Sequence, residues 1–337
     1  MHSVQGRSEG VRASRLMDGR TLSRFVVVTL LALVSGAASS PSVQPVASKA
    51  RDVRLVGRWD ITITTPTGSA PSWIEIDSSG REALVGRIVG IVGSVRPISE
   101  IITEGDSLRF AVPRQWEDGT GELRVVGRLQ GDRLVGRMTF PNNTTLNWQG
   151  SRAPRLARAH APVWTAPIRL LNQNDLNGWQ PMGSSNQWVV RNGVLSSPRS
   201  GVNLRTSRTF GDFKLHIEFR YPRESNSGVY LRGRHEVQIE DDYGREPDSH
   251  RFSGVYGFIS PSEIAAKPAG QWQTYDITLV GRMLTVVANG KTVICNQEIP
   301  GITGGALDSN EGAPGPLYLQ GDHGPIEYRN IVITPAR

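Results

Sequence analysis

Two short segments in the C-terminal half of the sequence carry polar side chains at every second position. This spacing gathers side chains on one face of a β-strand. In the second segment the polar residues are Glu236, Gln238 and Glu240. The residues between them, Val237 and Ile239, are apolar and predict that the opposite face packs in a core. We therefore expect Glu236 and Gln238 on the open, concave face of a sheet.

The preceding segment, residues 229–232, is expected to pair with 235–240 and to present Tyr230 and Arg232 on one face. Carboxylates, amides and an arginine can bond sugar hydroxyl groups, and an aromatic ring can lie against a sugar ring. The pattern therefore favours a carbohydrate site. The alternative is that Arg232 and Glu236 form a cross-strand ion pair on a solvated face.

Other polar residues are candidates, each with a purely structural alternative. His323 follows Asp322 in a glycine-flanked loop, where it could move protons near neutral pH or simply be a surface histidine. Asn226 could hold a ligand or only shape a turn. Asp241 ends its strand, so alternation does not fix its face. Composition alone predicts that Lys267 faces solvent.

The sequence gives little support for a bound metal or cofactor. His235, Asp242, Asp248 and His250 could be ligands, but no spacing of a known metal site joins them. Cys295 is the only cysteine, which excludes an internal disulfide and a zinc site built from thiolates alone. The sequence has neither a nucleophile elbow nor a phosphate loop. We expect no cofactor; a divalent metal is the alternative, but the sequence does not support one.

The elements that must position these residues are strands. Short alternating segments, 37 glycines and 21 prolines predict an all-β protein with many turns. In the second half, residues 213–220 alternate cleanly. Residues 272–279 and 283–288 form a hairpin, and Asn289-Gly290 begins the next turn. We expect two stacked antiparallel sheets in this half.

The first half predicts a small antiparallel barrel. The tripeptide Val-Gly-Arg recurs at 56–58, 85–87, 126–128 and 135–137, and glycines inside strands permit the bends that a small barrel needs. Gly57-Arg58-Trp59 is similar to the G-x-W sequence that opens lipocalins. About 100 residues predict fewer than the eight strands of a lipocalin, so we assign this domain to no family. It contains no catalytic cluster.

The N-terminal residues have the pattern of a secretory signal peptide. Arg20 and Arg24 precede the apolar run 25–34, and small residues follow it. The run is shorter than the ~20 residues that span a bilayer, although an N-terminal anchor is the alternative. We expect an exported protein, periplasmic or extracellular. The expected layout is a signal peptide at 1–39 with Met17 as a candidate start, a linker at 40–50, the barrel at 51–150, a second linker at 151–162, and the sandwich at 163–337.

Charge argues against a nucleic-acid partner. The net charge is +7, but residues 161–337 balance 17 basic against 17 acidic side chains. The basic excess therefore lies outside the half that carries the polar cluster, whereas nucleic-acid binding needs clustered basic charge on the binding domain. We expect a carbohydrate partner and no nucleic acid. After removal of the signal peptide, we expect the protein to lie outside the membrane or at its periphery. Nothing in the sequence sets the oligomeric state.

The second half resembles the 3-keto-disaccharide hydrolase family, once known as a domain of unknown function. The resemblance extends from Ile168 to Ile333, and the order of its segments carries it. Leu170-Leu171-Asn172 and Asp175–Trp179 match the family's opening "LFNGKDLSGW". The later matching segments are 188–195, 204–206, 211–213, 225–233, 236–241, 254–257, 267–272, 315–324 and 328–331. Gln271 and Gln273 depart from the Glu and Asn usual around Trp272.

The resemblance implies a concanavalin-like jelly roll that acts on sugars oxidised to a ketone at C3. A C3 ketone acidifies the hydrogen on C2, so a base can remove it and the glycosidic oxygen can leave from C1. Water then adds to the enone, which gives net hydrolysis. The catalytic candidates are Glu236, His323, Asp241 and Arg232, with Glu236 or His323 as acid and base, Asp241 in support and Arg232 at the enolate oxygen. The substrate-binding candidates are Asn226, Tyr230, Gln238, Lys267 and Gln320.

The alternative function is a carbohydrate-binding jelly roll without catalysis, because a concave face can serve either role. Binding modules usually display an aromatic platform. The matched segments are rich instead in Glu, Asp, Arg, Gln and His, which favours an enzyme.

Overall fold

The computed structural model describes residues 53–337, which belong to one compact unit. The predicted signal peptide, the candidate start at Met17 and the whole of the first linker lie outside the described residues. No helix among residues 53–337 is both long enough and apolar enough to cross a membrane. A single 3-10 turn, η1 (Val53–Leu55), precedes the first strand.

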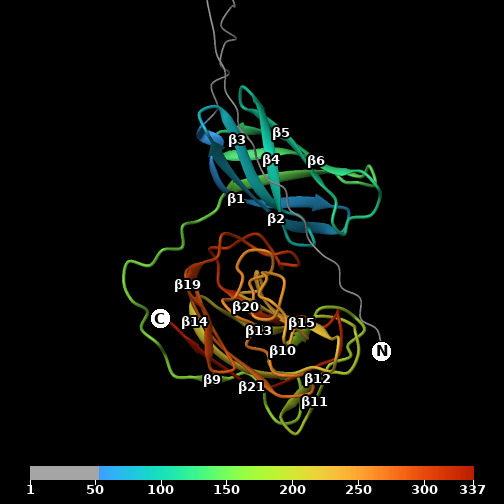
Figure 1. The fold of residues 1–337 in the computed structure, drawn as a ribbon, viewed down its shortest axis with the longest axis vertical. Helices are drawn as coiled ribbons and strands as arrows, with labels where there is room; N and C mark the ends of the chain where they lie inside the picture. Colours follow the sequence, from blue (N-terminus) through green and yellow to red (C-terminus); the bar gives the residue numbers. More distant parts are fainter. Residues whose placement is uncertain (1–52) are drawn as a thin grey trace, which may run out of the picture. The chain divides into compact units, whose positions relative to one another are not determined.

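The first eight strands close into an antiparallel barrel, coloured blue to green in Figure 1. The strands are β1 (Gly57–Thr65), β2 (Gly68–Ser79), β3 (Ala83–Val89), β4 (Val95–Glu104), β5 (Ser107–Pro113), β6 (Glu122–Gln130), β7 (Arg133–Thr139) and β8 (Thr145–Arg152). Each pairs with the next, and β1 closes the barrel on β8. The expectation of fewer than eight strands is therefore wrong. Turns as short as Gly131-Asp132 leave enough residues for eight.

Two glycines of the Val-Gly-Arg repeats make room for a tryptophan inside the barrel. Trp148 is 3% exposed, and its indole would collide with a Cβ at Gly127 or Gly136. A third repeat glycine, Gly86, lies where the pairing of β3 with β4 shifts register. At these glycines the missing side chain lets neighbouring groups approach the backbone closely and lets the strands bend, as we predicted from the Val-Gly-Arg repeats.

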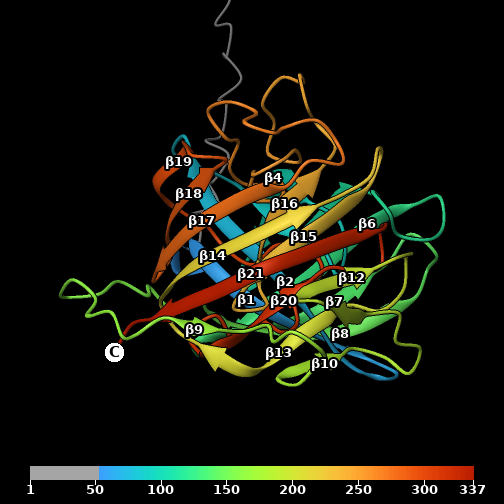
Figure 2. The same cartoon turned by 90° about the horizontal axis from the view of Figure 1, so that it is seen from below.

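The remaining strands form two sheets that enclose one core, as Figure 2 shows for the larger sheet. The smaller sheet has the order β10 (Trp179–Pro181), β13 (Leu204–Phe210), β20 (Gly315–Leu319), β15 (Asn226–Leu231), β16 (His235–Glu240). The larger sheet has the order β11 (Val189–Arg191), β12 (Val194–Ser197), β21 (Ile326–Pro335), β14 (Phe213–Arg220), β17 (Gln273–Val280), β18 (Met283–Ala288), β19 (Lys291–Glu298), with β9 (Ile168–Arg169) paired to β21.

Strand alternation predicted the core of the sandwich correctly. Phe213, Leu215, Ile217 and Phe219 are all buried on one face of β14, and the expected β17–β18 hairpin pairs as predicted. The protein is all-β, with a small antiparallel barrel followed by a jelly-roll sandwich, which confirms the predicted fold class.

A long loop between β19 and β20, residues 299–314, makes contacts with both the barrel and the sandwich. Arg282, at the β17–β18 turn, forms a bidentate ion pair with Glu311 of this loop, and both side chains are buried. The guanidinium of Arg282 also donates to the Pro154 carbonyl in the segment that follows the barrel. On the barrel side, Trp73 packs directly on Gly301. The loop is thus held from both sides.

Asp60 of β1 approaches Glu311 from the barrel. Asp60 is 6% exposed. Its burial and the Glu311 carboxylate raise the pKa of Asp60 to about 9. Asp60 is therefore protonated at neutral pH.

This protonation predicts how stability depends on pH. The folded state keeps the Asp60 proton up to about pH 9, whereas the unfolded chain releases it near 3.8. Asp60 therefore makes the folded protein less stable as pH rises between these values, by up to ~1.4 kcal/mol per pH unit. Asp60→Asn should remove this slope, measured by chemical unfolding between pH 5 and pH 8. The exposed Asp77→Asn is the control, and an unchanged slope in Asp60→Asn would refute the assignment.

Candidate functional site

Glu236 lies in β16, the last strand in the order of the smaller sheet, on the face away from the core. Strand pairing sets it directly opposite Tyr230, whose hydroxyl lies 2.9 Å from a Glu236 carboxylate oxygen. The other oxygen occupies the space above Gly228, where a Cβ would collide with it. On the opposite face, Val237 and Ile239 are fully buried in the core, as alternation predicted.

Glu236 and Gln238 are covered rather than open, which differs from expectation. They are 4% and 3% exposed. Residues 253–256 run along β16: Tyr256 donates its N–H to the Glu236 carbonyl, and Gln238 donates its N–H to Gly254. From the β19–β20 loop, Thr303 accepts the Glu236 N–H at 3.0 Å. These segments pair along the edge of β16, and the Gly304 carbonyl of the β19–β20 loop lies 3.0 Å from the Tyr230 hydroxyl on the face itself. Alternation cannot reveal such a cover.

The burial of Glu236 sets its protonation state. Desolvation raises the pKa of Glu236 to about 8, against the opposing effects of the Tyr230 hydrogen bond and the nearby His323. A carboxyl group in apolar, enclosed surroundings holds its proton in this way. At neutral pH Glu236 is mostly a neutral acid, able to donate a proton.

Two stacked tyrosines form the floor beside Glu236. The rings of Tyr230 and Tyr318 lie 4.3 Å apart at 16°, on strands that pair at these two residues. The Tyr318 hydroxyl accepts a hydrogen bond from Asn203 at 2.7 Å. Sequence analysis missed Tyr318 and Asn203. Strand alternation could have identified Tyr318, because it lies between the core residues Leu317 and Leu319 and so belongs to the opposite face.

His323 and Asp322 form a hydrogen-bonded pair in the loop that follows β20. Nδ1 of His323 lies 2.6 Å from the Asp322 carboxylate, which also accepts from Asn203. The Asp322 hydrogen bond raises the pKa of His323, while the His323 interaction and that of Asn203 hold the pKa of Asp322 below its ordinary value despite burial. Glu236 also raises the pKa of His323, so the two groups are close enough to interact. In the neutral imidazole Nδ1 carries the proton, which leaves Nε2 as a base.

Two buried amides face this cluster with unused acceptors. Gln238 donates to the His250 carbonyl, and its side-chain oxygen has no hydrogen-bond partner within residues 53–337. The side-chain oxygen of Gln320 is equally without one in the described part of the chain. An unpaired buried acceptor costs ~1–3 kcal/mol, which a ligand hydroxyl could recover.

The structure does not bring Arg232 to Glu236. β15 ends at Leu231, and Arg232 takes a left-handed backbone conformation with φ 52° in the turn. Its guanidinium donates to the Gly281 carbonyl at 2.6 Å, and burial lowers its pKa to about 10. The alternation argument fails here because the strand stops one residue earlier than expected.

Three other candidates hold backbone segments or lie at the margin. Asp241 accepts the backbone N–H of Glu224. The Lys267 ammonium donates to the Trp272 carbonyl at 3.0 Å, and its backbone is held on both sides by the amide of Gln273. Gln273 therefore has a structural role. Asn226 pairs with Glu240 at the open end of β15 and β16.

A hollow of about 580 Å³ opens beside this end of β16. Its lining residues are Glu240, Glu246, Pro247, Asp248, His250 and Arg251. Desolvation raises the pKa of Glu240, and Asp242 raises it further. The imidazole of His250 lies edge-on to Tyr256 at 5.1 Å. The volume falls within the ~300–1,000 Å³ typical of small-molecule sites.

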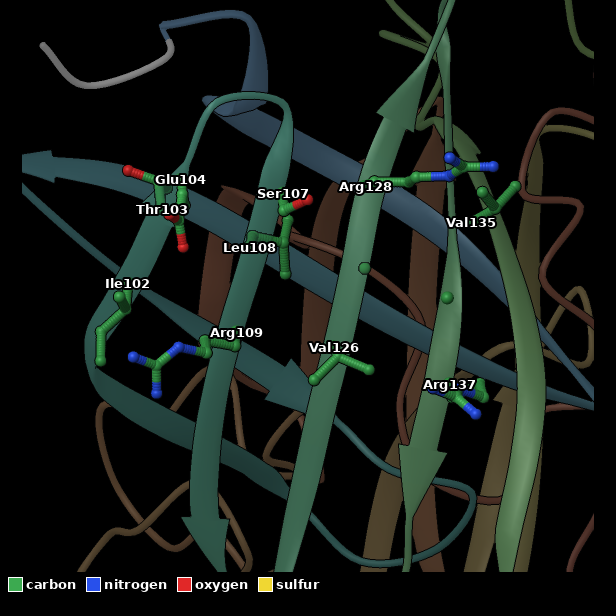
Figure 3. Close-up of a pocket in the computed structure, with 12 residues that line it drawn as sticks. Ile102, Thr103, Glu104, Ser107, Leu108, Arg109, Val126, Arg128, Val135 and Arg137 are labelled. Carbon is green, nitrogen blue, oxygen red and sulfur yellow. The ribbon is translucent and has the colours of Figure 1, made fainter.

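The barrel carries a separate groove of about 410 Å³ on its outer face, shown in Figure 3. Arg109, Arg128 and Arg137 come from three neighbouring strands and surround Val126. The groove contains no histidine and one carboxylate, Glu104. It lacks the paired acid and base of the sandwich.

No group of three or more His, Cys, Asp or Glu side chains in residues 53–337 is arranged to hold a metal ion. His235, one of the potential ligands, is fully buried, and burial holds its pKa well below the ordinary value. Asp248 instead bonds His250 at 2.8 Å.

Comparison with known proteins identifies the sandwich. The model of the 3-keto-alpha-glucoside-1,2-lyase-like domain matches residues 166–334, half of the chain. The chain belongs to this family. The match to the 3-keto-alpha-glucoside-1,2-lyase-like family includes every candidate site residue and stops short of the barrel. It confirms the predicted resemblance and makes the sandwich a glycoside-acting or carbohydrate-binding domain.

Several solved structures are similar to part of the chain. A "putative glycosyl hydrolase" from Parabacteroides distasonis is 25% identical over 54% of this chain and 96% of its own, with a TM-score of 0.43. A second from the same organism is 23% identical over 50% and 98%, with a TM-score of 0.40. The carbohydrate-binding module CBM66 from Bacillus subtilis is 11% identical over 46% and 93%, with a TM-score of 0.31. No curated protein sequence matches the chain.

The geometry predicts the effect of Tyr230 on the neighbouring acid. The Tyr230 hydroxyl stabilises the ionised form of Glu236, so Tyr230→Phe should raise the Glu236 pKa above about 8. A carbon-13 NMR titration of labelled glutamate side chains measures this. Tyr318→Phe keeps the Tyr230 hydrogen bond and serves as the control. A Glu236 pKa that falls, or stays unchanged, in Tyr230→Phe would contradict the assigned contact.

Proposed function

We propose that the sandwich cleaves 3-keto glycosides by elimination followed by hydration. One observation carries the proposal: a neutral, buried carboxyl group, Glu236, lies within electrostatic reach of a base, His323, that a carboxylate orients. Family membership supports the substrate class. The acid comes from β16 and the base from the loop that follows β20, a strand of the same sheet.

The reaction would proceed as follows. Nε2 of His323 takes the proton from C2, and the electron pair of the C–H bond forms the enolate of the C3 ketone. The enolate then re-forms the ketone, the C1–O bond breaks, and Glu236 gives its proton to the departing oxygen. Water adds across the resulting C1–C2 double bond, with its oxygen at C1. Every step is a proton transfer by a side chain or a bond change in the sugar, and general acid and base catalysis contribute ~10²–10⁴-fold each.

The other side chains of the face would hold the sugar. Asn226, Gln238 and Gln320 offer amide groups for hydroxyls, and the two amide oxygens without partners are suited to accept from them. The stacked pair of Tyr230 and Tyr318 gives the site a rigid floor. We give Arg232, Asp241 and Lys267 no part in the chemistry, because their polar atoms bond the backbone.

An ordinary two-carboxylate glycosidase fits this face less well. Such enzymes place two carboxyl groups ~5–9.5 Å apart on either side of the bond. Glu236 and Glu240 are four residues apart on one strand, which separates their backbones by about 13 Å. Asp322 cannot serve as the second carboxyl group, because its carboxylate is hydrogen-bonded to His323. We also propose that the enzyme is exported, on the strength of the predicted signal peptide.

The decisive test offers the purified protein a 3-keto disaccharide and, separately, its unoxidised parent. We expect monosaccharide release from the keto sugar only. Glu236→Gln keeps the shape of the side chain but cannot donate a carboxyl proton, and should lower turnover ~10²–10⁴-fold. Glu263→Gln, an exposed glutamate paired with Lys291, should match the wild type. Cleavage of the parent sugar would overturn the elimination mechanism, and binding without cleavage would favour a binding module.

The assigned roles predict a narrow pH optimum. His323 must be neutral, so activity should rise as pH passes its pKa, which Asp322 raises above 6.5. Glu236 must be protonated, so activity should fall through about pH 8. A profile of kcat/KM against pH measures both limbs, and Glu236→Gln should lose the upper one. An upper limb that persists in Glu236→Gln would assign it to another group.

A further inference from the structure

Three exposed arginines gather in the groove on the outer face of the barrel. Arg109, Arg128 and Arg137 come from β5, β6 and β7 and line this groove of about 410 Å³. Their guanidinium groups make no hydrogen bond or ion pair with any residue that the structure describes. By contrast, Arg87 and Arg96 of the same barrel each pair with a glutamate. The groove therefore holds positive charge that the chain leaves without a partner.

Strand register places these charges around one aliphatic side chain. Val126 lies directly between Arg109 on β5 and Arg137 on β7, and Arg128 is two residues further along β6. Neighbouring strands are ~4.8 Å apart, so roughly 10 Å separates the Cα atoms of Arg109 and Arg137. Val126 is 43% exposed, and Ile102, which pairs with Arg109, is 38% exposed. The groove thus combines spread positive charge with exposed aliphatic surface.

This arrangement does not stabilise the barrel. Like charges on neighbouring strands repel each other. Glu104 is the only acidic residue in the lining, and it forms no ion pair with the part of the chain that the structure describes. Uncompensated charge beside exposed aliphatic groups indicates a ligand from outside the chain, one that brings negative charge and an apolar surface together.

The directions of the arginines indicate several negative groups on the ligand rather than one. In Figure 3 the Arg109 guanidinium extends to one side of Val126 and the Arg128 guanidinium to the other. The side chains therefore do not converge on a single phosphate or carboxylate. A ligand with negative groups at intervals along its length matches this spread, and a groove suits a linear chain better than a flat lipid surface.

The lining distinguishes among anionic chains. It includes no aromatic ring, whereas proteins that bind single-stranded nucleic acid stack its bases on aromatic side chains. A bound peptide gains main-chain hydrogen bonds by adding to a strand edge, and the closed barrel has no such edge. An acidic polysaccharide needs neither feature. Its carboxylates can pair with arginine, and the C–H groups of its rings can contact Val126 and Ile102.

We propose that this groove binds a carboxylate-bearing polysaccharide, a polyuronate, and so attaches the protein to that polymer. Carboxylates along the sugar chain pair with Arg109, Arg128 and Arg137, and a ring between them lies on Val126. The groove is lined by barrel residues alone, and the barrel lies outside the matched domain. The attachment site is therefore independent of the reaction proposed for the sandwich.

Calorimetric titration of the purified protein with two polyuronates, polygalacturonate and alginate, tests the proposal. We expect binding of at least one that weakens as salt is raised, because exposed charge pairs are screened. Arg109→Gln with Arg137→Gln should weaken it about tenfold, on the scale of two exposed ion pairs. Val126→Glu, which sets a carboxylate between the arginines, should weaken it at least as much. The matched control, Arg81→Gln with Arg191→Gln, removes two exposed arginines outside the groove and should bind as the wild type does.

Other ligands separate the sources of negative charge. Fully methyl-esterified polygalacturonate keeps the sugar chain without its charge and should not bind. Polyglutamate and vesicles that contain phosphatidylglycerol should bind at least tenfold more weakly than the polyuronate. Equal binding of either would overturn the polysaccharide assignment, as would equal weakening in the control variant or no binding of either polyuronate.

The same variants keep this test separate from the proposed function. Arg109→Gln with Arg137→Gln should cleave a soluble 3-keto disaccharide at the wild-type rate, because the groove contains no residue of the sandwich. If no sugar is cleaved but the polyuronate still binds through these arginines, the attachment site stands and the reaction falls. If the keto disaccharide is cleaved and no polyuronate binds, the reaction stands and the attachment site falls.

Discussion

The buried ion pair between Arg282 and Glu311 holds together the parts of the molecule on which the site depends. A charge removed from water is costly unless it is paired and hydrogen-bonded. Here the guanidinium satisfies Glu311 twice and also bonds the carbonyls of Pro154 and Pro300. Arg282 thus fixes the loop 299–314 at its far end, while Trp73 of the barrel packs on its beginning. Thr303 and Gly304, which contact the site, lie between these two fixed points.

A loop held in this way explains why Glu236 is a neutral acid. Alternation alone would leave Glu236 on a solvated face with an ordinary pKa. The cover supplied by residues 253–256 and by Thr303 and Gly304 removes water from the carboxyl group. Gly228 gives it space, and Tyr230 supplies a single strong partner rather than the two or three donors that would keep it ionised. The chemistry of the face therefore depends on segments that are distant in sequence.

Period-two alternation was enough to predict the sandwich core and the face that carries Glu236. It succeeded because burial on one face of a strand imposes the pattern directly on Phe213 to Phe219 and on Val237 and Ile239. It failed at Arg232, because a strand end is set by the turn that follows and not by the pattern within the strand. It could not find the pairing of Asp60 with Glu311, because that contact joins residues about 250 positions apart.

In the proposed function, the sandwich supplies the acid and the base, and the barrel helps to hold the loops that cover them. Acid and base must be held rigidly against the reacting carbons, and two paired strands with a stacked tyrosine floor provide that rigidity. Choice among glycosides depends instead on surfaces beyond the reacting ring, which can vary without disturbing the acid and base. The barrel contacts the covering loops through Ile91, Gly93 and Ser94, and through Trp73 on Gly301. In this arrangement the barrel supports the cover of Glu236, and the side chains assigned to proton transfer in the proposed function come from the sandwich.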